Sequence, residues 1–171
     1  MATAEGSSSP FWDAPENEIP RMERILSVVS RQPDKKSYAF FVGKSNNDNF
    51  VAYKWNGTEL APFWICTHNC SERRDKLNLA EELVYGINQT VTPNGDWHVN
   101  MRIEALQARI MNLALNDDDE PSLIGPVNNR LCVLEHAYVQ MRKGLMPDVD
   151  WIRITGRAVD DDSVQTEVVK K

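Results

Sequence analysis

The feature that most constrains the fold is an Asn56-Gly57 pair between two stretches rich in aromatic and aliphatic residues. Asn and Gly tolerate the positive φ angles of tight hairpin turns, and the pair is a strong local signal for a hairpin. Residues 50–55 and 60–67 are therefore expected to pair as antiparallel strands. A strand at residues 38–43 precedes them, and the three together predict a β-meander.

Further strands are expected because short apolar stretches alternate with turn residues, and no strand–helix–strand repeat occurs. They are predicted at residues 96–104, 107–115, 130–141, 149–155 and 164–169. Two helices are predicted, at residues 19–30 and 77–85; in the second, Asn78 and Glu81 have the spacing of a capping box. The predicted fold class is mainly β (α+β), an antiparallel β-sandwich or barrel of about eight strands with two short helices.

Length and composition indicate one folded domain that follows a short arm. The chain has 171 residues, which suits a single hydrophobic core. Residues 1–15 are small, polar and interrupted by proline, which predicts a flexible N-terminal arm. Residues 16–171 are expected to form a single β-rich domain. Phe11 and Trp12 stand out in the arm, and we expect them either to pack on the domain or to contact a protein partner.

Charge and hydropathy argue against several functional classes. The net charge of −6 disfavours a nucleic-acid binder, because phosphate recognition needs clustered Lys and Arg. No stretch approaches the ~18 apolar residues of a membrane span, and the N-terminus lacks the apolar region of a secretory signal. The odd number of cysteines, three, fits a compartment that keeps every thiol reduced. We therefore predict a soluble, acidic, cytoplasmic protein without a membrane span.

The cluster most suggestive of chemistry is Cys66, His68 and Cys70, because residues two apart share one face of an extended strand. Thiolate and imidazole can ligate zinc, and a Cys–His pair can act as a nucleophile and its base. The spacing is unlike that of common zinc sites, whereas a free cysteine is often buried as a small hydrophobic residue. We therefore expect Cys66 to fill core space, with His68 at an edge or in a cleft, and we predict no catalytic residue, no metal and no cofactor.

Several short motifs resemble a family of domains of unknown function found in bacteria and in some microbial eukaryotes. They are Lys44-Ser45-Asn46 with Asn49, then residues 51–53, 62–65 and 83–87, followed by residues 149–156 and 164–169. The resemblance covers about residues 37–170. It implies a β-rich domain, and it brings no known activity with it.

The sequence favours a non-enzymatic binding or assembly module over an enzyme. No familiar catalytic or phosphate-binding motif is present, while polar and aromatic residues near the predicted meander offer a contact surface. The residues predicted to bind a small ligand are Lys44, Asn46, Asn49, Trp64, His68 and Tyr85, and those predicted to bind a protein partner or a second copy are Phe11 and Trp12. The alternative is an enzyme of unknown reaction that uses His68 with Cys66 or Cys70 in a cleft, with or without a metal.

Overall fold

The computed structural model describes residues 18–45, 49–66, 74–142 and 148–170. Its helical elements are α1 (Glu18–Ser30), η1 (Lys35–Ser37), α2 (Leu79–Tyr85) and η2 (Glu104–Leu106). The strands are β1 (Tyr38–Lys44), β2 (Asn49–Trp55), β3 (Leu60–Cys66), β4 (Arg74–Lys76), β5 (Ile87–Val91), β6 (Trp97–Met101), β7 (Ile110–Leu115), β8 (Pro121–Val127), β9 (Arg130–Arg142), β10 (Asp148–Ala158) and β11 (Val164–Lys170). The predicted arm of residues 1–15, with Phe11 and Trp12, lies outside the described residues.

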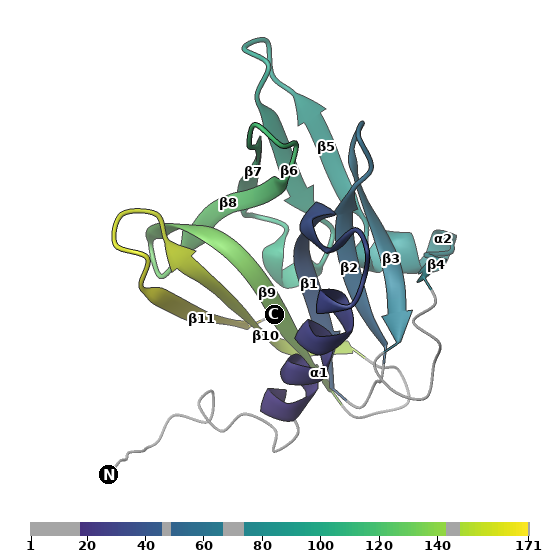
Figure 1. The fold of residues 1–171 in the computed structure, drawn as a ribbon. Helices are drawn as coiled ribbons and strands as arrows, with labels where there is room; N and C mark the ends of the chain where they lie inside the picture. The colour runs from purple at the N-terminus through teal and green to yellow at the C-terminus, as the bar shows by residue number, and fades with distance from the viewer. Residues whose placement is uncertain (1–17, 46–48, 67–73, 143–147, 171) are drawn as a thin grey trace.

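All the described strands belong to one sheet, which curls into a half-barrel (Figure 1). Its main path runs in the order β4-β3-β2-β1-β9-β8-β7-β6-β5, and β10 and β11 extend the sheet from β9. The long strand β9 joins its two parts, because its first half pairs with β8 and its second half with β1. The β1–β9 pairing is parallel, whereas the other strand pairs are antiparallel.

The structure confirms the mainly β fold with two helices, and it places the predicted meander in β1, β2 and β3. The hairpin turn is centred one residue later than Asn56-Gly57, since the Asn56 N–H donates to the Glu59 carbonyl at 3.0 Å. Gly57 supplies the positive φ of 95°. The Asn56 side chain accepts hydrogen bonds from the Thr58 and Glu59 N–H groups, each at 2.9 Å, and so stabilises the turn.

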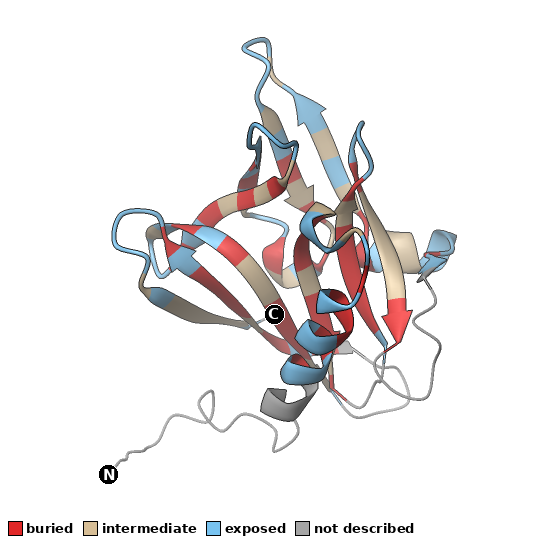
Figure 2. Ribbon diagram, in the orientation of Figure 1, coloured by how far each residue is buried: buried red, intermediate tan, exposed pale blue. Residues whose placement is uncertain are grey.

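The buried apolar residues form two clusters on opposite faces of the sheet. Figure 2 shows how buried positions are distributed along the strands and along α1. The larger cluster fills the inside of the curl, where β1 contributes Phe40 and Val42 and β2 contributes Val51 and Tyr53. The smaller cluster lies beneath α1, whose Met22 and Ile25 share it with side chains from the other face of β1 and β2. This division follows from the alternation of side chains along a strand, and it decides which residues point into the barrel.

The capping box predicted for α2 is confirmed. The Asn78 side chain accepts from the Glu81 N–H at 2.8 Å, and the Glu81 carboxylate accepts from the Asn78 N–H at 2.9 Å. The helix ends at Gly86, whose N–H donates to the Glu82 carbonyl. The cap fixes both the start of α2 and the position of the Glu81 side chain.

Candidate functional site

Three of the predicted ligand-binding residues lie at one open end of the half-barrel. Lys44 ends β1, Asn49 begins β2, and Trp64 follows on β3. Lys44 is two residues beyond Val42 and Asn49 two before Val51, so both side chains share the inner face with the larger core cluster. The meander therefore brings together residues that are up to 20 positions apart in the sequence.

Tyr85 joins this group from the last residue of α2. The Lys44 Nζ lies 5.1 Å from the centre of the Tyr85 ring and 5.4 Å from the Trp64 ring. The two rings meet edge to face, with centroids 5.6 Å apart and an interplanar angle of 75°. A cation–π contact between an ammonium group and an aromatic ring contributes about 0.5 to 2 kcal/mol, and more where water is excluded. We call Lys44, Trp64 and Tyr85 the lysine–aromatic cluster.

A cavity of about 360 Å³ opens beside the lysine–aromatic cluster. Its volume lies within the usual range for pockets that hold small molecules. The lining side chains are mostly polar or charged: Lys44, Asn49, Trp64, Asp75, Lys76 and Glu81. Asp75 and Lys76 come from β4, which pairs with β3 opposite Trp64 and Phe63. The cavity therefore has both cationic and anionic groups at its wall.

Two hydrogen-bond donors at this cavity lack acceptors among the described residues. The Trp64 Nε1 is buried without a hydrogen-bond partner, and the Lys44 ammonium contacts the two rings but forms no ion pair there. Burial lowers the pKa of Lys44, and the charge of Glu81 only partly opposes this effect. A buried donor left without an acceptor costs about 1 to 3 kcal/mol. These two donors are thus left without acceptors, although the Asp75 and Glu81 carboxylates also line the cavity.

The comparison with known families identifies the family to which the chain belongs. The family model described as "Domain of unknown function (DUF4833)" matches residues 40–168. The chain belongs to this family. No curated protein and no solved structure matches it. The resemblance inferred from the motifs is therefore confirmed, and the matched residues include every strand and α2 of the DUF4833 domain except the ends of β1 and β11.

A buried hydrogen bond fixes the position of Tyr85 in the lysine–aromatic cluster of the DUF4833 domain. The Tyr53 hydroxyl, which is fully buried in β2, donates to the Tyr85 carbonyl at 2.7 Å. Burial and, to a smaller extent, the charge of Glu81 together raise the pKa of Tyr85 to about 12. The Tyr85 hydroxyl therefore stays protonated at neutral pH, and the end of α2 is held against the barrel.

The cysteine predictions for the DUF4833 domain need one correction. Cys66 is buried as predicted, but it is disulfide-bonded rather than a free thiol. A disulfide requires a close approach of two Cα atoms, which the spacing of three cysteines in a sequence does not reveal. Cys132 is a free, fully buried thiol, and burial raises its pKa. His68, Cys70 and Asn46 lie outside the described residues.

Three residues at the cavity of the DUF4833 site were not predicted from the sequence: Asp75, Lys76 and Glu81. Glu81 was assigned to the cap of α2, and this role also positions its carboxylate near Lys44. In the part of the chain that the structure describes, no three His, Cys, Asp or Glu side chains are grouped closely enough to hold a metal ion. Neither of its α-helices has the length and apolar content needed to cross a membrane.

Proposed function

We propose that this chain is a non-enzymatic binding module that takes a small acidic ligand into the cavity beside Lys44. The observation that carries the proposal is the pair of donors without acceptors, the Lys44 ammonium and the Trp64 indole N–H, at one cavity. A carboxylate would accept hydrogen bonds from both donors, and charge-assisted bonds of this kind are the stronger class. Asn49 supplies a further polar group to the same cavity.

The electrostatics of the cavity favour an anion over a cation. The acidic groups at the cavity are Asp75 and Glu81. The charge of Glu81 acts on Lys44, but its carboxylate already accepts the capping hydrogen bond from the Asn78 N–H. The lowered pKa of Lys44 means that its charge is under-compensated where it lies. A bound carboxylate would supply the missing negative charge, and it would therefore raise the pKa of Lys44 towards its ordinary value.

Binding is favoured over the alternative of Cys–His catalysis by the state of Cys66. A thiolate is the nucleophilic form of cysteine, and Cys66 is held in a disulfide. Its thiol is not available to a neighbouring base while that bond persists. The buried Cys132 belongs to the larger core cluster and is not among the residues that line this cavity.

The Trp64 indole N–H gives a direct measure of ligand binding. In ¹H–¹⁵N spectra of the full chain, Trp64→Phe identifies the Trp64 signal by its disappearance. We expect this signal to shift saturably when small carboxylates from acetate to citrate are added at constant ionic strength. The corresponding neutral amides should leave it in place, because they cannot supply a charged acceptor to Lys44.

Trp97 provides the matched control, since its ring packs against Trp55 at 5.8 Å in the larger core cluster and is not part of this cavity. Its indole signal, assigned with Trp97→Phe, should not move in the same titrations. If the Trp64 signal stays fixed with every carboxylate, or moves equally with the amides, the proposed anion site is wrong.

The disulfide at Cys66 also bears on the cellular compartment in which the protein is found. Disulfides persist in oxidising compartments and are rare in the cytosol. We therefore infer an oxidising compartment in place of the cytoplasmic one that composition predicts. Because one disulfide uses two of the three cysteines, denatured and unreduced protein should react with one equivalent of iodoacetamide, and reduced protein with three. Three reactive thiols before reduction, in protein acid-quenched in its source cells, would contradict the inference.

A further inference from the structure

The cavity beside Lys44 has charges of both signs on the face of the sheet that carries Trp64. Asp75 pairs with Trp64 across β3 and β4, so the two side chains leave the sheet on the same face. Glu81 reaches the cavity from α2. Lys76 also lines the cavity, but it follows Asp75 directly on β4, and its side chain therefore starts from the opposite face. Besides Lys44, two carboxylates thus belong to this face of the cavity.

The charge of Glu81 acts on the lysine–aromatic cluster. It partly opposes the effect of burial on the pKa of Lys44, and it adds to the effect of burial on the pKa of Tyr85. One carboxylate oxygen, Oε1, accepts the capping hydrogen bond from the Asn78 N–H at 2.9 Å. No described residue donates to the other oxygen or forms an ion pair with Glu81. The Glu81 carboxylate can therefore accept a further hydrogen bond from a ligand.

We propose that the ligand of this cavity is a zwitterionic amino acid. Its carboxylate accepts from Lys44 and Trp64, and its ammonium group faces the carboxylates of Asp75 and Glu81. The inference rests on the proposed acidic-ligand site and narrows the ligand to one chemical class. An ammonium group carries three N–H donors, and its bonds to carboxylates are charge-assisted. A ligand with a carboxylate alone would satisfy the two donors, but it would leave both acidic side chains without a counter-charge.

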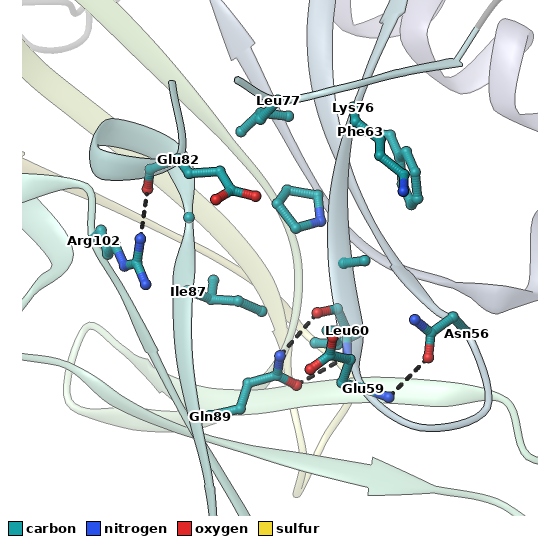
Figure 3. A pocket seen from close by; sticks show the side chains of 13 residues that line it. Asn56, Glu59, Leu60, Phe63, Lys76, Leu77, Glu82, Ile87, Gln89 and Arg102 are labelled. Carbon is teal, nitrogen blue, oxygen red and sulfur yellow. Dashed lines mark hydrogen bonds between the residues drawn. The ribbon is translucent and has the colours of Figure 1, made fainter. Parts of the chain in front are cut away.

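A second cavity, of about 330 Å³, adjoins the first and shares Lys76 with it (Figure 3). Its other donor side chains already have acceptors. The Arg102 guanidinium donates to the Glu82 carbonyl at 3.1 Å, and the Gln89 amide donates to the Leu60 carbonyl at 2.8 Å. The buried donor without an acceptor, the Trp64 indole N–H, is at the first cavity. We therefore assign the amino acid to the first cavity.

Matched pairs of ligands test the two halves of the site separately. Acetate and glycine, propionate and β-alanine, and butyrate and γ-aminobutyrate differ within each pair by the ammonium group. The three pairs also vary the separation of this group from the carboxylate. Titration of the Trp64 indole signal of the full chain, at neutral pH and constant ionic strength, gives each Kd. In at least one pair the amino acid should bind about tenfold more tightly than its acid, as expected for one charge-assisted hydrogen bond.

Glu81→Gln removes the charge of one carboxylate and keeps the start of α2, because glutamine can replace glutamate in a capping box. The variant should lose about tenfold in affinity for the amino acid that wild type prefers. Its affinity for the matched acid should not fall, because the change removes a charge of the same sign as the ligand. A cavity distorted by the substitution would weaken the binding of both ligands, so the two responses distinguish a lost contact from a damaged site.

Glu82→Gln is the matched control, since Glu82 follows Glu81 in the first turn of α2 and lines the second cavity but not the first. It should leave the affinities for acid and amino acid unchanged. Equal affinities for acid and amino acid in every pair, or equal losses in the two variants, would overturn the amino-acid assignment and leave the anion site in place. If none of the six ligands shifts the Trp64 signal, the anion site itself is wrong.

Discussion

Lys44→Met should weaken the binding of a small carboxylate by about 10- to 100-fold, because a hydrogen bond to a charged group contributes about 1.5 to 3 kcal/mol. Methionine keeps the length and most of the volume of the side chain between Trp64 and Tyr85, and it removes the charge and the N–H donors. Titration of the Trp64 indole signal measures the change in affinity. Lys35→Met, at an exposed lysine before the opposite end of β1, should leave the affinity unchanged. Equal affinities of wild type and Lys44→Met for the carboxylate would show that Lys44 does not bind the ligand.

The same substitution has a signature in the pH dependence of stability. Burial lowers the pKa of Lys44 below 10.5 in the folded chain, so between these two pKa values the unfolded chain binds more protons. The contribution of Lys44 to the free energy of unfolding therefore rises with pH in that alkaline window and is most unfavourable below it. Urea unfolding of wild type and Lys44→Met measures the two free energies of unfolding. Their difference should change with pH only in that alkaline window. A difference that is constant with pH would contradict the burial of the Lys44 charge.

Two tyrosines also titrate near this alkaline window, and comparing wild type with Lys44→Met removes their contribution from the measured difference in stability. Burial raises the pKa of Tyr53, and raises that of Tyr85 to about 12, so their stabilising effect is lost as pH increases beyond the ordinary tyrosine value. Both tyrosines are present in wild type and in Lys44→Met. Their contribution is opposite in sign to that of Lys44, and it cancels when the two unfolding free energies are subtracted.

The meander and α2 could be predicted because their signals are local. The turn at Gly57 and the capping box of Asn78 and Glu81 each depend on residues within four positions of one another. The strands β4, β5 and β8 were missed for different physical reasons. β4 has three residues, β5 is mostly polar, and β8 contains Pro121 and Pro126, which indicate a loop when read without their neighbours. The parallel pairing of β1 with β9 joins segments about 95 residues apart, which no local pattern encodes.

The candidate site was predicted only where strand alternation and the family-like motifs marked its residues. Lys44, Asn49 and Trp64 were named from the sequence, and the structure places them at one cavity with Tyr85 behind them. Asp75 and Lys76 reach it through a long-range pairing of β4 with β3, and Glu81 reaches it from α2. These positions depend on tertiary contacts, so the charge balance of the cavity could not be read from the sequence.

Gly156→Ala should destabilise the fold by about 2 to 3 kcal/mol, because the added Cβ has no room between β10 and β9. A Cβ at Gly156 would lie 2.7 Å from the Val133 carbonyl oxygen and 3.2 Å from the Cys132 Cβ. The clash is mainly with backbone, which cannot move away as a flexible side chain can. Gly156 also lies at an irregularity in the β9–β10 register, where the close approach of the strands accompanies the curl of the sheet.

Gly43→Ala is the matched control, since Gly43 is also a strand glycine with crowded surroundings. Its added Cβ would meet the Ile25 Cδ1 and the Met22 Sδ, each at 3.1 Å, and these are the movable ends of side chains. We expect a loss below about 1 kcal/mol there. At roughly 2 to 4 °C per kcal/mol for a domain of this size, thermal unfolding resolves the two variants. Equal losses in melting temperature would show that backbone contact at Gly156 is not what holds β10 against β9, and the curl would then have to depend on side-chain packing inside the barrel.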